Sequence, residues 1–128
     1  MWTILILGIT FSVLGLSHSA CVFQRNFEFP VNYECRINTG KLVFQSDGNL
    51  VIYDGNGLAK WSTLTAGVGE RAVFQGDGNF VIYNIANHPE WNSGTTGRGR
   101  TLIFQDDRNF VIYDKADRPV WYTSTNGK

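Results

Sequence analysis

Residues 42–53 read LVFQSDGNLVIY, and nearly the same twelve letters return at 72–83 (AVFQGDGNFVIY) and at 102–113 (LIFQDDRNFVIY). The step between the copies is 30 residues. Three tryptophans keep the same step: Trp61, Trp91 and Trp121. Self-similarity at a fixed period is typical of repeat proteins, in which one unit buries its apolar face only against its neighbours. The sequence therefore predicts a threefold array with a common core.

Each repeat is expected to consist of short β-strands. Phe, Val, Ile, Leu and Tyr dominate the copies, and no helical spacing of apolar residues is present. Two copies place an Asp-Gly pair in the middle, which tolerates positive φ, whereas the third has Arg108 where the glycine stands. Arg108 would carry a small strain cost if its φ is positive. We expect three or four strands per repeat, in three small all-β sheets that bury their apolar faces around one axis.

Alternation along the strands predicts which side chains form the core. One face of each expected strand pair is apolar throughout. The bulk of the tryptophans would fill the centre of the array, and stacking on a sugar at the surface is the alternative role. The predicted core comprises Leu42, Phe44, Leu50, Ile52, Phe74, Phe80, Ile82, Phe104, Phe110, Ile112 and the tryptophans Trp61, Trp91 and Trp121.

The distribution of charge favours a neutral ligand. Eleven basic and 11 acidic residues give a formal net charge of zero, and no run of Lys or Arg is present, which argues against a nucleic-acid or anionic-membrane surface. An enzyme is not expected, because His88 is the only histidine after residue 20 and no catalytic triad or phosphate loop is visible. Each repeat supplies mainly one carboxylate, whereas glycoside hydrolysis needs two. We expect a binding protein without a cofactor or a metal.

The first twenty residues have the features of a secretory signal peptide. The segment from Ile4 to Leu16 is almost wholly apolar and is too short to span a bilayer, and residues 17–20 include the small residues of a cleavage region. A buried N-terminal helix or strand is the alternative. Removal of residues 1–20 would leave one secreted domain, 21–128.

The two cysteines, Cys21 and Cys35, both lie shortly after the expected cleavage point. In an oxidising compartment a disulfide between them is the ordinary expectation. A lipid anchor on Cys21 and a metal site are less favoured alternatives, since His18 fits a lipidation signal poorly and no second Cys/His pair is present.

The outward face of each copy carries an unusual set of side chains. In the first copy it presents Gln45, Asp47, Asn49, Val51 and Tyr53, and the same five types recur in the other two. Amides and carboxylates donate and accept in fixed directions, which suits the paired hydroxyls of a sugar ring, and an exposed valine would contact the ring C–H groups. The alternatives are that these groups satisfy their own turn or hold calcium, for which one carboxylate per site, or two in the third copy, is too few.

The pattern Q-x-D-x-N-x-V-x-Y, present three times with the intervening Trp, resembles the bulb-type (monocot, snowdrop-lectin-like) mannose-binding lectin family over residues 22–126. The resemblance implies a β-prism II fold: three four-stranded antiparallel sheets around a pseudo-threefold axis, with the tryptophans inside. It also implies calcium-independent binding of α-D-mannose and mannose-rich glycans through up to three sites per chain.

The resemblance also assigns roles to the motif residues. Gln45 would bond the sugar O3, Asp47 and Asn49 would hold the axial O2, Tyr53 would bond O4, and Val51 would pack against the ring. The corresponding residues of the other copies are Gln75, Asp77, Asn79, Val81 and Tyr83, and Gln105, Asp107, Asn109, Val111 and Tyr113.

One departure from the family pattern concerns the disulfide. Plant members commonly have a disulfide that joins the turn of one motif to the strand that enters the next. Here those two places are Gly48 and Ala72, so that disulfide is absent. Family members often form homodimers, which this chain could also do. The alternative function is a protein-binding or toxin-like module on the same prism, in which the sugar sites are of minor importance.

Overall fold

The computed structural model describes residues 3–6, 9–12 and 20–128. Every regular element in these residues is a β-strand, so no described helix is long and apolar enough to cross a membrane. The strands are β1 Thr3–Ile6, β2 Ile9–Ser12, β3 Cys21–Gln24, β4 Phe27–Phe29, β5 Tyr33–Ile37, β6 Gly40–Phe44, β7 Leu50–Asp54, β8 Ala59–Ser62, β9 Arg71–Phe74, β10 Phe80–Tyr83, β11 Pro89–Asn92, β12 Thr101–Phe104, β13 Phe110–Tyr113 and β14 Pro119–Tyr122.

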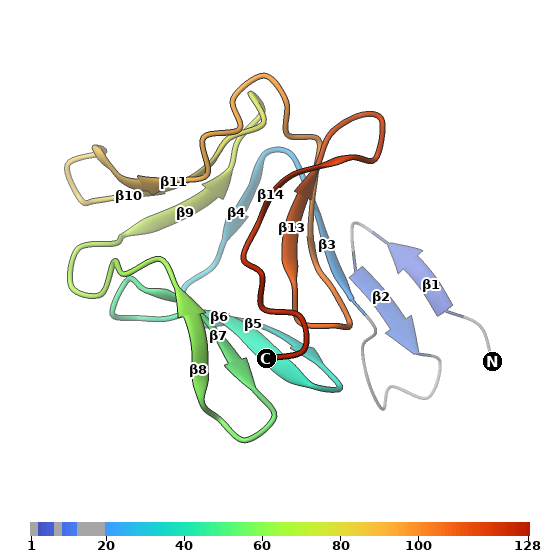
Figure 1. Ribbon diagram of the computed structural model, residues 1–128. Coiled ribbons are helices and arrows are strands. Elements are labelled where there is room, and N and C mark those ends of the chain that lie inside the picture. Colours follow the sequence, from blue (N-terminus) through green and yellow to red (C-terminus); the bar gives the residue numbers. More distant parts are fainter. Residues whose placement is uncertain (1–2, 7–8, 13–19) are drawn as a thin grey trace.

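Three antiparallel sheets form the sides of a prism (Figure 1). Their strand orders are β5-β6-β7-β8, β4-β9-β10-β11 and β3-β12-β13-β14, and the hairpin β1-β2 extends the third sheet beside β3. Each repeat supplies three consecutive strands, and the fourth strand of each sheet comes from residues 21–37. The predicted β-prism II fold is confirmed.

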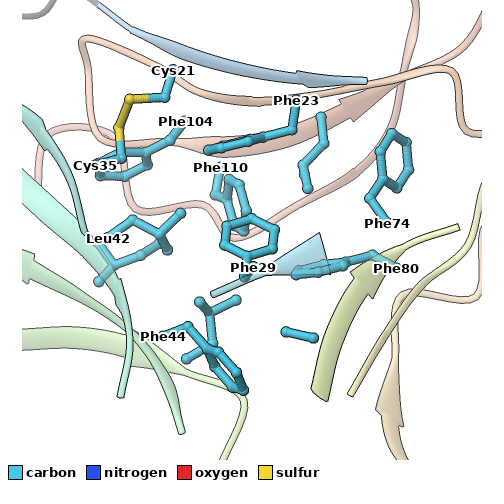
Figure 2. Close-up of a cluster of buried hydrophobic side chains, with 14 of the residues drawn as sticks. Cys21, Phe23, Phe29, Cys35, Leu42, Phe44, Phe74, Phe80, Phe104 and Phe110 are labelled. Atoms are coloured by element: carbon cyan, nitrogen blue, oxygen red, sulfur yellow. A yellow bond between two sulfur atoms is a disulfide. The ribbon is translucent and has the colours of Figure 1, made fainter. Parts of the chain in front are cut away.

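Residues 21–37 form a ribbon that visits the three sheets in turn. β3 pairs with β12, β4 with β9 and β5 with β6. The predicted disulfide is confirmed: Cys21 of β3 is bonded to Cys35 of β5, so the bond joins the first and last strands of the ribbon. Closing a loop of this length stabilises a fold by about 3 kcal/mol in the chain-entropy model. Figure 2 shows the disulfide at the edge of the buried cluster.

The predicted core residues of the strands are buried. The inward side chains of all three repeats have relative exposures of 0–1 %. Residues i and i+2 of a strand point to the same face, and in each sheet this face is turned to the interior. Phe23 and Phe29 of the ribbon join this core from one end, with ring centroids 4.8 Å apart. Figure 2 shows phenylalanines from the ribbon and the repeats converging on one interior. The three sheets thus share a single core.

The three tryptophans lie on β8, β11 and β14, the edge strands opposite the ribbon. Each indole packs edge-on against the other two, with centroids 5.6–5.9 Å apart. They pack against the core but remain half-buried on these edge strands. Their predicted packing role is confirmed, although they are not fully enclosed.

Close turn-to-turn contacts join neighbouring repeats. Gly48 and Gly78 have φ of 89° and 91°, and a Cβ at Gly78 would lie 2.5 Å from the carbonyl oxygen of Gly99. Arg108 has φ 74° in the third copy, so the condition for the small strain cost expected from the sequence is met. Its Nη1 donates to the carbonyl of Thr39 at 2.9 Å. Side-chain hydrogen bonding therefore joins the third repeat to the first.

The expected signal peptide overlaps the hairpin β1-β2. In the uncleaved chain β2 of this hairpin pairs in register with β3 at one position, Ile9 with Cys21. Residues 1–2, 7–8 and 13–19, which include the expected cleavage region, lie outside the described residues. Cleavage therefore stays a prediction.

Candidate functional site

Each five-residue motif spans a β-hairpin at the outer face of one sheet. In the first copy Gln45 follows β6, Asp47 lies in the turn and Asn49 precedes β7. Gln45 N–H donates to the carbonyl of Asn49 at 2.9 Å, and Asn49 N–H donates to Asp47 Oδ1 at 2.9 Å. The other copies repeat both bonds. The turn therefore fixes the backbone that carries the three polar side chains.

The glutamine of each motif is held between the tyrosine and the aspartate. Tyr53 OH donates to Gln45 Oε1, and Gln45 Nε2 donates to both oxygens of Asp47 at 3.2 Å. The same chain of bonds recurs in the second and third copies. The structure thus brings Gln, Asp and Tyr together in a preorganised row that is half-buried to exposed.

The asparagine of each motif is anchored through its oxygen only. Asn49 Oδ1 accepts from Thr63 Oγ1 at 3.2 Å and from Thr65 N–H at 3.1 Å. The Nδ2 atoms of Asn49 and Asn109 have no hydrogen-bond partner among the described residues. In the second copy Asn79 Nδ2 has one long contact, 3.4 Å from Asn92 Oδ1. The alternative that these groups satisfy their own turn is therefore correct for Asp47 Oδ1, which accepts from Asn49 N–H. The oxygen of Asn49 instead holds a loop 14–16 residues away, and its Nδ2 is left free to meet a ligand.

Sequence reasoning missed the hydroxyl residues that hold this asparagine. Thr65 is 2 % exposed and also donates its hydroxyl to the carbonyl of Gly48 at 2.7 Å. A usable signal is present in the sequence, because a Thr follows every repeat tryptophan by four residues and a Ser or Thr follows it by two. The residues are Thr63, Thr65, Ser93, Thr95, Thr123 and Thr125.

The valine of the motif is not exposed, so that part of the sequence prediction is wrong. Val51, Val81 and Val111 are 3 %, 3 % and 2 % exposed. They lie on the central part of the sheet, where Val51 pairs with Val43 on one side and with Ser62 on the other. Neighbouring strands therefore cover the side chain, and only its edge is left for a ligand.

The three sites differ in what lies beside the tyrosine. Lys41 Nζ lies 5.5 Å from the ring centroid of Tyr53, and the guanidinium of Arg71 lies 4.9 Å from that of Tyr83. The third tyrosine, Tyr113, pairs across the strands with Thr101. Burial and then the negative charge of Asp107 raise the pKa of Tyr113 above its usual value. The phenol therefore stays protonated and able to donate at neutral pH.

A hollow lies at the third site. A cavity of about 210 Å³ is lined there by motif residues together with Tyr122, which pairs with Val111 and is 56 % exposed. Ser62 and Asn92 occupy the corresponding place in the other repeats. An exposed aromatic ring beside a polar row adds apolar area for a sugar face.

Within the described residues, no group of three or more His, Cys, Asp or Glu side chains is placed to hold a metal ion. Each site offers one network of fixed donors and acceptors around the motif carboxylate, with Asp106 as a second acid in the turn of the third site. Such a surface can bind a neutral polyhydroxylated ligand by hydrogen bonds alone.

Scans against protein-family models and curated proteins give no match, whereas several solved structures do match. One is a monomeric monocot mannose-binding lectin from Gastrodia elata, 33% identical over 82% of this chain and 97% of that chain, with a TM-score of 0.73. Another is the mannose-specific agglutinin from snowdrop (Galanthus nivalis) bulbs in complex with methyl-α-D-mannoside, 34% identical over 84% and 98% of the two chains, with a TM-score of 0.65.

A third similar structure is the lectin of Polygonatum cyrtonema in complex with a monomannoside. It is 28% identical over 84% of this chain and 98% of that chain, with a TM-score of 0.64. In all three cases the match runs through nearly the whole of the solved chain. The similarity therefore covers all three repeats.

Proposed function

Because this chain belongs to the bulb-type monocot mannose-binding lectin family, we propose that it is a calcium-independent, non-enzymatic lectin for α-D-mannose and mannose-rich glycans. The observation that carries the proposal is the threefold recurrence of one preorganised network, in which Tyr, Gln and Asp side chains hold one another and Asn is anchored by its oxygen.

The free atoms of the network suit a hydroxyl pair. In the first site Asn49 Nδ2 would donate to the axial O2 of mannose while that hydroxyl donates to Asp47. Gln45 would bond O3, Tyr53 would bond O4, and the edge of Val51 would touch the ring. Hydroxyls accept and donate at once, so a donor beside an acceptor satisfies O2 completely. The second and third sites would act in the same way.

Affinity at one site is expected to be low. Each motif is an open surface, so a monosaccharide makes only a few hydrogen bonds of roughly 0.5–1.5 kcal/mol net each. This corresponds to a Kd of about 1 mM, or about −4 kcal/mol. Three sites on one rigid prism provide multivalency within a single chain. A branched glycan that engages several sites at once is expected to bind more tightly than a monosaccharide by a factor on the order of 10²–10⁴.

The first experiment is titration with methyl-α-D-mannoside, with the galactoside as control. We expect millimolar binding of the mannoside with up to three sites, no detectable binding of the galactoside, whose O2 is equatorial and O4 axial, and no change on addition of EDTA. Equal binding of both sugars or loss of binding in EDTA would contradict the proposal. A glycan array without any mannose signal would favour the protein-binding alternative.

We also propose that the protein is secreted after removal of its first residues. The apolar N-terminal segment and the Cys21–Cys35 disulfide, which persists in oxidising compartments, support this. Mass spectrometry of protein from a secreting host is expected to find the mature N-terminus between His18 and Cys21. Retention of Met1 in the secreted protein is the result that would exclude a cleaved signal peptide.

A further inference from the structure

A cavity of about 330 Å³ lies where the chain leaves β3, enters β12 and turns between β13 and β14. None of the motif residues lines it. Its charged walls are Arg25, Arg98, Arg100, Asp114, Lys115 and Arg118. The whole chain has a formal net charge of zero, so the fold creates a local excess of positive charge from residues far apart in sequence.

The one carboxylate of this cationic cavity is already engaged. Asp114 Oδ1 accepts from the N–H groups of Arg118 and Ala116 at 3.0 and 2.8 Å, and Oδ2 pairs with Arg118 Nε at 3.1 Å. These N–H groups and the Arg118 charge hold the pKa of Asp114 below its usual value. In the described part of the chain the other four cations form no ion pair. Their charge is therefore available to a ligand.

The internal repeats provide a control for what the fold itself requires. The first repeat has a similar hollow of about 300 Å³ at the equivalent place, and its two cations, Arg36 and Lys41, both pair with Glu34. The other two repeats lack these cations at the equivalent positions. In the second repeat, Arg98, Arg100, Lys115 and Arg118 are replaced by Val68, Glu70, Ile85 and His88. In the first repeat the residues are Asn38, Gly40, Gly55 and Leu58. A hollow at this place therefore does not require cations at those four positions.

We propose that the cationic cavity binds sulfate groups carried by a glycan. Guanidinium groups match the oxygens of such an anion in pairs, and four available cations suit a ligand with more than one negative charge. No aromatic side chain lines the cavity, so it offers no platform for stacking nucleic-acid bases. The proposal goes beyond neutral-sugar binding and uses none of the motif residues.

The test is calorimetric titration of the full chain with dextran sulfate and with unsulfated dextran of the same length. The cavity variant combines Arg98→Gln, Arg100→Gln and Lys115→Gln. The control variant combines Arg36→Gln, Lys60→Gln and Lys128→Gln. Both variants lose three positive charges, but the second set lies outside the cavity. We expect sulfated dextran alone to bind, the first variant to lose about tenfold in affinity, and the control to stay within about twofold of the parent.

Each other result overturns the proposal. Equal losses in both variants would mean attraction to net charge only, and unchanged affinity in the first would place binding elsewhere. Tighter binding of a single-stranded oligonucleotide of equal charge would identify a nucleic-acid surface, and saturation by free sulfate at equal affinity would remove the need for a glycan.

If the first variant has a lowered Tm, the three substitutions are made singly and the affinity of each single variant for dextran sulfate is measured instead. The combined Asn49, Asn79 and Asn109 variant described below should still bind dextran sulfate, which separates this site from the mannose sites.

Discussion

A variant that combines Asn49→Asp, Asn79→Asp and Asn109→Asp is expected to lose detectable mannoside binding while it keeps the fold. An aspartate keeps the oxygen that accepts from Thr63 and Thr65 in the first site, so the anchoring bonds remain. It replaces the free Nδ2 donor by a second acceptor beside Asp47. The axial hydroxyl of mannose has one proton and cannot donate to both. Titration is expected to show a loss of about tenfold or more at every site, from an affinity already near millimolar.

Two controls separate binding from stability. Asn84→Asp changes the same residue type in a turn outside the motif, where the other repeats already have Asp54 and Asp114, and it should leave mannoside binding unchanged. The Asn49→Ala variant removes the acceptor of the buried Thr65 N–H and should lower the free energy of unfolding by about 1–3 kcal/mol. If the folded triple Asp variant binds mannoside as well as the parent, the site assignment is wrong.

Those controls follow from a feature that the sequence did not reveal. The motif predicted a solvent-facing asparagine, and a change at Asn49 would then have left the fold intact. The oxygen of this side chain instead holds Thr65, which is separated from it by 16 residues. Val51 was likewise expected to be exposed and is covered by neighbouring strands. Alternation gives the face of the sheet on which a side chain lies, but how far neighbouring strands cover it depends on their packing.

The repeat itself predicted the fold because its period, its turns and its apolar alternation agree. The core from Leu42 to Ile112 could be assigned residue by residue from one copy. The ribbon of residues 21–37 could not, because it has no counterpart in the repeats and its strands pair with partners up to 83 positions away, as Cys21 does with Phe104. The cationic cavity was hidden for the same reason, since Arg25 and Lys115 meet only in the folded chain.

Gly78→Ala is expected to be strongly destabilising, as is Gly48→Ala, where φ is 89° and a Cβ would clash with the carbonyl oxygen of Gly69. A Cβ at Gly78 would lie 2.5 Å from the carbonyl oxygen of Gly99, and φ is 91°. The left-handed backbone costs an alanine about 1–2 kcal/mol, and forced displacement of packed backbone adds about 1–3 kcal/mol. We expect the free energy of unfolding to fall by about 2–5 kcal/mol in denaturant titration, a large part of the stability of a domain of this size.

Gly97→Ala is the matched control, because it separates backbone strain from the steric clash. Gly97 has φ 82°, and nothing lies within 4 Å of a Cβ built on it. It should therefore carry only the strain of about 1–2 kcal/mol. Arg108, which has φ 74° at the place equivalent to Gly78, shows that this backbone accepts a side chain where no glycine turn packs against it. Equal losses in the two variants would mean that strain alone requires glycine in the turn, and that the contact between Gly78 and Gly99 does not hold the second and third repeats together.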